Sequence, residues 1–526
     1  MAISPSRTWL GASLAGILLC GASSAAMAAP ADAAKLQAMQ QQLDEMRAQL
    51  QQMQSATQAD ARLTAMQQQL DTMAAQLAAM KTTQDETSAD IATLKLPPAP
   101  ASVSATLSNG KPGFATADGR FSANVRAIVM LDAGKYFQDG GLAANVPGRD
   151  LGEGTNFRRA RLGLDGRLFT DFDYAFVYEF GGSGAEESGR LYEASVTYTA
   201  LKPFRIKLGA YEPNIGLAAA VSTSQMPLME RPAPAEIARN VAAGDSRVTA
   251  QVTGAGSFGS GDSGLATRWF ASTAVTGSTI GAAQSFDEQT AWIGRVALAP
   301  FNGPAWQAHF GANYQYVIHP GDAGPSATPR YPAQLRDRPE LRIDGTRLID
   351  TGAIDARHVS VLGLEAGLTA GPFLIEGEWY RYDIDRRITT AVAPKDPRFD
   401  GWYVQGAWVL TGESRPYNPA EARFDAPKPA YNFSPAAGAW GAFEVAARYS
   451  VTDLNYRAGP QGTTSVLGAV RGGEQKILTF GANWYLNPTI RLMLDYQHVD
   501  IDRLNAAGAQ IGQDYDAVAG RMQVSF

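Results

Sequence analysis

The sequence has only one cysteine, Cys20, among 526 residues. Cys20 ends a short apolar run that follows Arg7 and precedes Ala26-Met27-Ala28. That order of charge, apolar core and A-x-A stretch is typical of a secretory signal, so we expect residues 1–28 to be removed. Leu19, rather than a small residue, precedes Cys20, which argues against lipid attachment. The exported chain would then contain no cysteine and could form no disulfide.

Long apolar runs and a basic surface are also missing. After the expected signal, no stretch reaches the ~18 apolar residues of a membrane-spanning helix, and the mean hydropathy is −0.17. The net charge of −6 excludes the basic footprint of a nucleic-acid-binding protein. The four histidines are scattered without metal-ligand spacing, so we expect no metal site. An exported chain without disulfides needs another source of stability, and a closed β-barrel, in which every strand is paired, supplies one.

Residues 34–95 have a helical period. Leu and Met alternate at spacings of three and four from Leu36 to Met53 and again from Leu63 to Met80. These positions resemble the a and d positions of a coiled coil. The second half repeats the first at an offset of 27 residues, one short of four heptads, which indicates a shift of the seam near 57–60. We predict a periplasmic, self-associating coiled-coil stalk over 29–95; a single exposed helix is the alternative.

Prolines separate this stalk from the remainder of the chain. Leu96-Pro-Pro-Ala-Pro100 cannot continue a helix and favours an extended spacer, so we predict a linker over 96–104. From about Ala105 the pattern changes to a period of two, as in Phe204–Tyr211 and Ile490–Gln497. Segments of about ten alternating residues separated by turns are typical of a transmembrane β-barrel. We therefore predict an all-β outer-membrane barrel over 105–526.

The C-terminus supports a bacterial outer-membrane barrel. Met522, Val524 and Phe526 share one strand face, and the chain stops on the aromatic residue. This ending resembles the last-strand signal by which the barrel-assembly machinery recognises its substrates. We therefore expect that machinery and outer-membrane lipid to be partners.

Four stretches resemble the phosphate-selective porin O and P family. They are a paired-arginine strand, a strand pair leading into a constriction loop, a proline-rich loop and the start of the penultimate hairpin: Phe157–Gly166; Tyr192–Thr199 with Ile206–Gly209 and Ile215–Leu217; Leu410–Glu413 with Phe424–Pro429; and Phe480–Asn487. The resemblance implies about 16 antiparallel strands, a homotrimer, and passive diffusion of small anions, phosphate-like solutes among them.

Pores select anions with Arg and Lys in the lumen. The period of two puts most candidate arginines on the lumen face; Arg158 has lipid-face parity but stands at a strand end. An arginine-bearing stretch, Leu335–Arg347, resembles an inward loop of the family, although its charges could simply pair with neighbouring carboxylates. The predicted anion-binding or pore-lining residues are Arg126, Arg158, Arg159, Arg161, Arg167, Arg205, Lys207, Ser222, Thr223, Ser224, Arg336, Arg338, Arg342 and Arg347.

The sequence departs from the phosphate-selective pattern at two positions. Tyr192 precedes Glu193 where an acidic pair is expected, so one carboxylate is missing. Where those members carry a lysine near small hydroxyl residues, this chain has Ala219. That difference leaves open a non-selective or organic-solute porin on the same scaffold. A structural protein that tethers the outer membrane through its coiled coil is a third alternative.

No catalytic constellation is evident, and we expect neither an enzyme nor a cofactor. Gly261-Asp-Ser-Gly264 resembles a serine-protease string but lies in a glycine-rich turn. Glu193, Glu376 and Glu378 are expected to face the lumen without a His or Ser partner, which favours pore lining over hydrolysis.

Overall fold

The computed structural model describes residues 29–53, 60–93, 102–108, 110–182, 189–259, 266–281, 286–300, 303, 306–387 and 395–526. The chain divides into two compact units, 1–100 and 101–526. The expected signal, the Gly261–Gly264 string and most of the proline-rich linker lie outside the described residues.

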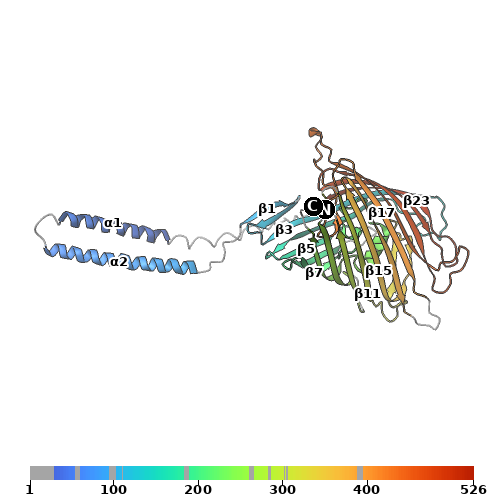
Figure 1. The fold of residues 1–526 in the computed structure, drawn as a ribbon, viewed down its shortest axis with the longest axis horizontal. Helices are drawn as coiled ribbons and strands as arrows, with labels where there is room; N and C mark the ends of the chain where they lie inside the picture. Colours follow the sequence, from blue (N-terminus) through green and yellow to red (C-terminus); the bar gives the residue numbers. More distant parts are fainter. Residues whose placement is uncertain are drawn as a thin grey trace, which may run out of the picture. The chain divides into compact units, whose positions relative to one another are not determined.

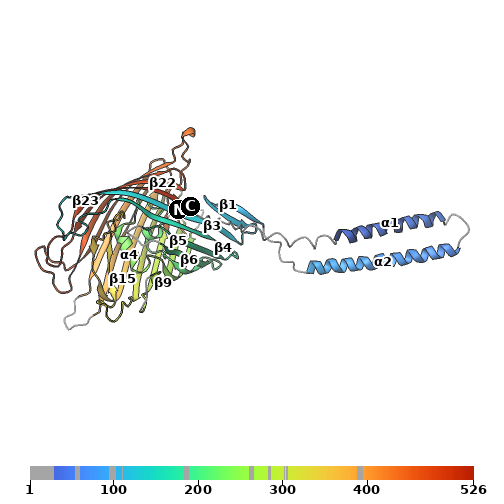
Figure 2. The ribbon, with the colours of Figure 1, turned by 180° about the vertical axis from the view of Figure 1, so that it is seen from behind.

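The first unit contains two helices, α1 (Ala29–Met53) and α2 (Asp60–Thr93). They lie side by side in both ribbon views (Figure 1, Figure 2) and contact each other. Leu43 and Leu50 of α1 are buried, whereas Met66 and Leu70 of α2 are half-buried. The helix boundaries fall near the point where the sequence repeat changes register. Among the described residues, no helix has both the length and the apolar character needed to cross a membrane.

The second unit is a closed barrel of 16 antiparallel strands, which confirms the predicted all-β barrel. In order around the ring they are β3 (Ser122–Gln138), β4 (Gly154–Leu168), β5 (Phe172–Glu179), β6 (Arg190–Tyr198), β7 (Phe204–Tyr211), β8 (Arg247–Phe258), β9 (Thr267–Thr279), β10 (Thr290–Ala299), β11 (Trp306–His319), β15 (Ile354–Ala370), β16 (Phe373–Arg386), β17 (Arg398–Val409), β20 (Ala442–Tyr456), β21 (Val470–Tyr485), β22 (Ile490–Asp502) and β23 (Asp514–Ser525).

The apolar and polar residues that alternate along each strand point to the outer and inner faces of the barrel wall. Along β22, Leu492 and Leu494 are exposed on the outer face, whereas Arg491 and Asp495 are buried on the inner face. Successive strand residues point to opposite faces, so each strand supplies apolar groups to the membrane and polar groups to the lumen. This inverted pattern is what a transmembrane barrel requires.

The ring closes where the last strand pairs with the first. β23 pairs with β3 over eleven residues from Tyr515↔Gln138 to Ser525↔Ile128. Phe526 extends the ladder by exchanging two backbone hydrogen bonds with Ala127, of 2.9 and 3.0 Å. Beyond this point, β2 (Lys111–Thr116) pairs with the start of β3 and with β1 (Val103–Ser108).

The two ends of the barrel differ in their connections. The end at which β3 begins and β23 ends, hereafter the terminal end, has mostly short turns, such as 371–372 between β15 and β16. The opposite end, hereafter the loop end, has long connections. In outer-membrane barrels short turns face the periplasm and long loops face outward, which assigns the terminal end to the periplasmic side.

Three connections fold into the barrel. Loop 212–246 enters from the loop end and contains α3 (Leu217–Ala220) and α4 (Ala233–Ala242); α4 contacts strands from β9 to β20. Loop 320–353 enters from the same end. The first half of segment 410–441, with the buried Arg415 and Phe424, enters from the terminal end, whereas residues 430–432 and 435–438 stay exposed. The short elements of the last two are β12 (Pro332–Ala333), β13 (Arg336–Asp337), β14 (Ile349–Asp350), β18 (Tyr417–Asn418), β19 (Arg423–Phe424) and the 3-10 helix η2 (Pro435–Ala437).

Glycines in the wall make room for these segments. An added Cβ at Gly481 of β21 would lie 2.4 Å from Leu228 of loop 212–246, and one at Gly367 of β15 would lie 2.6 Å from Phe424. Glycine in a strand interior often marks such a close approach. The inward segments therefore pack directly against the wall.

Candidate functional site

Glu230 of loop 212–246 is the centre of a buried charge cluster. Its carboxylate accepts hydrogen bonds from Arg158 at 2.8 and 3.0 Å and from Arg521 at 2.6 Å, and Arg159 and Arg342 lie 3.8 Å away. Burial opposes the ionisation of Glu230, but Arg158, Arg521 and Arg159 together hold its pKa well below its usual range. These arginines are therefore occupied by a fixed carboxylate.

A β-bulge accounts for the position of Arg158. The β3–β4 register runs Met130↔Arg159 and then Leu131↔Phe157, which leaves Arg158 as the extra residue. A bulge re-aims side chains at such a point. Arg158 and Arg159 both face the interior, each at most 4% exposed. The lipid-face parity predicted for Arg158 is thus wrong, because strict alternation does not continue through a bulge.

Loop 320–353 divides its arginines between buried and accessible positions. Arg342 is buried and bonds Glu236 at 3.1 Å, and Arg338 is also buried and donates to the Gly345 carbonyl at 3.0 Å. Arg336 is exposed and Arg347 half-exposed. Within the described part of the chain, neither of these two forms an ion pair. Burial and the adjacent Arg336 lower the pKa of Arg347, so two positive charges stand close together here.

Arginines also hold loop 212–246 by its backbone carbonyl groups. Arg491 of β22 donates to Met226 O at 2.8 Å, and Arg448 of β20 donates to Glu230 O at 3.0 Å. Further pairs include Arg231 with Ala218 and Val221, Arg423 with Ala220, Arg415 with Gln225, Arg521 with Met229, and Arg247 with Asn240 and Gly244. Buried backbone carbonyls need donors, and guanidinium groups supply them here in place of secondary structure.

Glu378, predicted to line the pore, instead anchors the start of α3. Its two carboxylate oxygens accept the backbone N–H groups of Leu217 at 2.6 Å and Ala218 at 2.9 Å, and the hydroxyls of Tyr380 and Tyr403. The Glu378 side chain is therefore fully occupied and only 4% exposed. Its role in this structure is to fix the loop.

Segment 410–441 meets loop 212–246 inside the barrel. Arg295 of β10 is bound to Glu365 of the wall at 2.7 Å, to Asn214 of the loop at 2.7 Å, and to the carbonyl of Ala422 in the segment at 2.7 Å. Arg423 of the segment reaches Ala220 O at 2.6 Å. The two segments thus narrow the lumen from opposite ends and share contacts.

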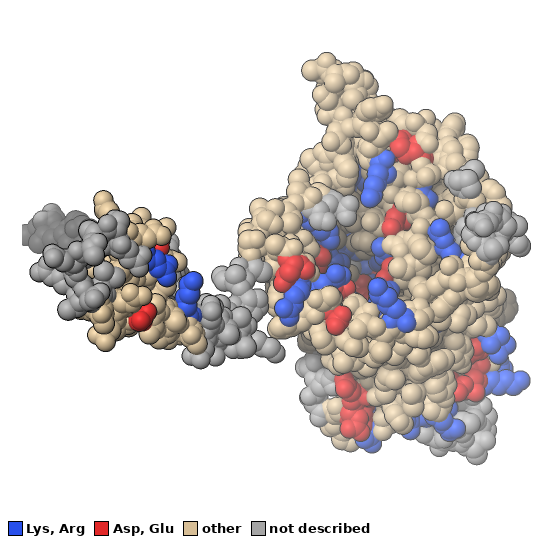
Figure 3. Space-filling view, turned by 60° about the vertical axis from the view of Figure 1, so that its left-hand side comes forward, with Lys and Arg blue, Asp and Glu red and all other residues tan. Residues whose placement is uncertain are grey.

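The part of the lumen wall formed by β3–β7 also carries more accessible cations. Arg126 and Lys207 bond the same carboxylate, Glu193, at 2.9 and 2.8 Å, and their side chains are 30% and 29% exposed against 10% for Glu193. Two cations on one carboxylate leave a net positive charge. The space-filling view shows basic and acidic side chains together around a hollow in this unit (Figure 3).

Each of the other predicted arginines on this side pairs with a carboxylate. Arg161 is buried, bonds Glu179 at 2.6 Å and lies 3.4 Å from the centroid of the Tyr192 ring. Arg205 bonds Glu421 at 3.3 Å. Arg167 bonds Asp173 at 3.1 Å, with both side chains nearly half exposed.

The hydroxyl residues of the expected constriction follow α3. Ser222 and Ser224 are half-buried with their Oγ atoms 3.2 Å apart, and Thr223 is buried. Ala219 packs against the hydrophobic core. Arg423, from segment 410–441, bonds Ala220 O just before these hydroxyl residues, and Asp425 pairs with it at 2.8 Å; Arg231 and Arg415 bond the carbonyl groups of Val221 and Gln225.

The sequence of this chain was compared with those of known proteins. The family model described as "Phosphate-selective porin O and P" matches residues 137–526. The chain belongs to this family. It is therefore an outer-membrane porin, a channel protein.

Individual relatives and solved structures share only a minority of their residues with this chain. The porin is 27% identical to Porin O of Pseudomonas aeruginosa over 429 residues, 78% of this chain and 90% of that protein. Among solved structures, it is similar to the outer-membrane channel DcaP of Acinetobacter baumannii, with 11% identity, a TM-score of 0.43, and coverage of 79% of this chain and 99% of that one. An anion-selective porin of Comamonas acidovorans is 13% identical, with a TM-score of 0.43 and coverage of 77% and 100%.

Sequence reasoning missed much of the interior of this porin. It omitted Glu230 and the arginines that hold loop 212–246 or bridge the inward segments: Arg231, Arg239, Arg295, Arg415, Arg448, Arg491 and Arg521. Strand parity contained the signal for Arg448, Arg491 and Arg521, which alternate with outward apolar residues. Nothing local in the sequence indicated that Glu230 or Arg415 would be buried, since both lie in long connections.

Proposed function

We propose that this porin lets small anions, phosphate-like solutes among them, diffuse passively through each barrel. The observation that carries the proposal is the Arg126–Glu193–Lys207 triad, in which two half-exposed cations share one carboxylate. Arg336 and Arg347 supply further positive potential toward the loop end. Lumen cations favour anions over cations by their fixed potential.

Single-channel recording in a potassium chloride gradient tests this proposal. We expect a reversal potential that reports chloride preference, and a smaller preference in the double variant Arg126→Gln/Lys207→Gln. Arg398→Gln is the matched control, because Arg398 pairs with Asp383 on the outer face. A reversal potential showing cation preference in the native protein contradicts the proposal.

A non-selective or organic-solute pore on the same scaffold is the second candidate function. Ala219 favours it, since no lysine accompanies Ser222 and Ser224, and the nearby Arg423 is paired with Asp425. Titration of phosphate into chloride-bathed channels separates the two functions. Block at micromolar to millimolar phosphate supports an anion site, whereas unchanged conductance supports the second function.

The same porin is proposed to be a homotrimer whose subunits meet through β5–β7. These strands have 8, 9 and 8 residues, at or below the ~9–11 residues of a tilted strand that crosses a bilayer. The outer face of β5 is aromatic at every second residue, from Phe172 to Tyr178, Phe180 follows the strand, and Phe176 is 54% exposed. Aromatic residues are enriched at protein interfaces, so a neighbouring subunit suits this wall better than lipid does.

The N-terminal helices are proposed to form a periplasmic coiled coil, and Phe526 to be read by the barrel-assembly machinery. The terminal end, which carries Phe526, faces the periplasm. A structural role for the helices is the third candidate function. Deletion of residues 34–95 tests it: a loosened envelope with unchanged solute uptake supports tethering, and impaired uptake contradicts it.

A further inference from the structure

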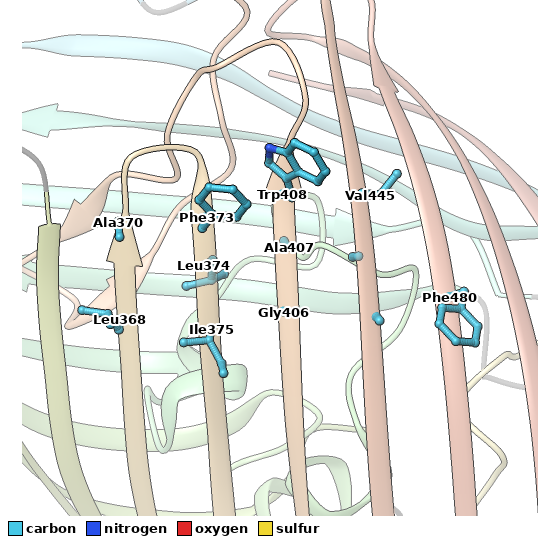
Figure 4. Close-up of a pocket in the computed structure, with 12 residues that line it drawn as sticks. Leu368, Ala370, Phe373, Leu374, Ile375, Gly406, Ala407, Trp408, Val445 and Phe480 are labelled. Carbon is cyan, nitrogen blue, oxygen red and sulfur yellow. The ribbon is translucent and has the colours of Figure 1, made fainter.

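The outer face of the barrel has an apolar depression of about 540 Å³ over strands β15 to β21. The lining residues lie on five neighbouring strands, β15, β16, β17, β20 and β21. Figure 4 shows Leu368, Ile375 and Phe480 projecting around small residues. All the residues that line it are apolar. The depression lies on the membrane-facing side of the wall and is separate from the solute path.

The strand register builds this depression. Ile375, Gly406, Ala447 and Phe480 are directly opposite one another on β16, β17, β20 and β21. Two small residues thus lie between two large ones, so the surface is hollowed over β17 and β20; this hollow is called the groove below. A Cβ built on Gly406 would meet only the Leu374 carbonyl oxygen, at 3.5 Å, so open space exists at the floor.

The groove is closed at the terminal end and continues toward the middle of the wall. The Phe373 and Trp408 rings stack with their centroids 5.4 Å apart, beside the 371–372 turn. In the other direction, Leu368 and Ile375 also line a second apolar depression, together with Leu364 and Val404. Together the two depressions extend over strands β11 to β21, and the end closed by Phe373 and Trp408 lies on the periplasmic side of the membrane.

We propose that this groove binds one acyl chain of a phospholipid from the periplasmic leaflet. The strands that form it, β15, β16, β17, β20 and β21, have 12 to 17 residues, enough to cross a bilayer. β17 is eight places around the ring from β6, so the groove is on the wall farthest from the short strands. Lipid, rather than a second subunit, therefore covers it.

The attraction comes from packing. Lipid tails are as apolar as the wall, so no hydrophobic gain distinguishes this site from the remainder of the surface. An unfilled depression, however, loses the dispersion contacts of its lining. A flexible methylene chain can follow the groove over Gly406 and Ala447, whereas a flat protein surface cannot. The inference depends on the outer-membrane location of the barrel and is independent of the solute that passes through it.

Native mass spectrometry of the full-length protein, titrated with phosphatidylethanolamine in detergent, tests the proposal. Gly406→Leu and Ala447→Leu each fill the floor of the groove. Gly520→Leu is the matched control: Gly520 lies on the outer face of β23, where an added Cβ would meet only the Met493 carbonyl oxygen, at 3.8 Å. The difference in gel migration between unheated and heated samples shows that each variant is folded before its bound lipid is measured.

We expect the native protein and Gly520→Leu to retain one phospholipid per subunit at a detergent concentration that strips the others. We expect both groove variants to lose it. Equal retention by all four proteins, or no retained lipid in the native protein, overturns the proposal. A change in the ratio of trimer to monomer in the groove variants, with lipid retention unchanged, also overturns it by identifying a second subunit as the occupant.

Discussion

At the scale of single residues, burial separates the arginines that hold the structure from those that can meet a solute. Arg158 is 3% exposed and bonded twice to Glu230, whereas Arg126 and Lys207 are about ten times more accessible. The sequence predicted that these residues are inside the barrel, because parity reports the face of a strand. It could not predict their accessibility, because that depends on loops whose course has no period.

The first prediction concerns the difference between buried and exposed ion pairs. Arg158→Gln should lower the free energy of unfolding by about 3 kcal/mol, because the buried carboxylate of Glu230 loses one of its ion-pair partners. Arg167→Gln should lower it by less than about 1 kcal/mol, because the Arg167–Asp173 pair is exposed. Urea unfolding in detergent, followed by tryptophan fluorescence, measures both. Equal losses in the two variants would contradict the structural role of Arg158.

A second prediction concerns pH and Asp337 in loop 320–353. Burial raises its pKa to about 7; Arg342, 3.6 Å away, opposes the rise, and Glu236 adds to it. The folded pKa exceeds the ~3.9 of an unfolded aspartate. The loop should therefore lose stability as pH rises from about 4 to about 7, with no further loss above that range.

Ionisation of Asp337 also adds a negative charge near Arg347. Chloride preference should consequently fall as pH rises through about 7, and Asp337→Asn should remove most of that change. Reversal potentials recorded on both sides of this pH give the measurement. If the reversal potentials of the native protein and the variant depend on pH in the same way, another group is responsible for the titration.

At the scale of elements, the inward segments are fixed by wall residues far away in the sequence. Loop 212–246 is bonded to β16 through Glu378, to β22 through Arg491 and to β23 through Arg521. The resemblance around Ile215–Leu217 is to a strand pair that leads into a constriction loop, but the sequence left open which loop folds inward. Its anchors could not be predicted, because each joins residues more than 150 positions apart.

The hydrogen bonds from arginines to the backbone carbonyl groups of loop 212–246 lead to the third prediction. Arg491→Met should give additional conductance levels and more open-channel noise, because Met226 O loses its 2.8 Å donor and the loop gains freedom. The reversal potential should stay within experimental error of the native value, since Arg491 is only 2% exposed. Single-channel traces report both quantities. A shifted reversal potential with a steady conductance would mean that Arg491 contacts the solute directly.

The wall glycines lead to the fourth prediction. Gly481→Ala should destabilise the barrel by about 1–3 kcal/mol through overpacking, because its Cβ would lie 2.4 Å from Leu228 and 2.7 Å from Asp495. Gly406→Ala, on the outer face of β17, has room for its Cβ and should have no such effect. Thermal unfolding of the two variants in the same detergent is the comparison. Similar transition temperatures would show that loop 212–246 shifts to accommodate the added methyl group at little cost in stability.

At the scale of the whole molecule, one barrel has two different walls. Its shortest strands, β5 to β7, form one side, and strands of 12 to 17 residues form the opposite side with its apolar groove. The class of fold and the approximate number of strands could be predicted from a period of two, a terminal aromatic residue and the family resemblance. The asymmetry of the walls could not, because it depends on where each strand ends, and strand ends are the least regular part of the pattern.

The last prediction follows from that asymmetry. If the short wall faces a neighbouring subunit, Phe176→Ala on β5 should lower the temperature at which the oligomer dissociates, because it removes an aromatic anchor from the interface. Phe310→Ala on β11 is the matched control: Phe310 is equally exposed, 57% against 54%, but lies on a longer strand of 14 residues. Gel migration of unheated and progressively heated samples gives both dissociation temperatures. Since both substitutions remove the same aromatic area from an outward position, lipid contact alone would change the two temperatures equally, and only a subunit interface at β5–β7 makes Phe176 the more sensitive position.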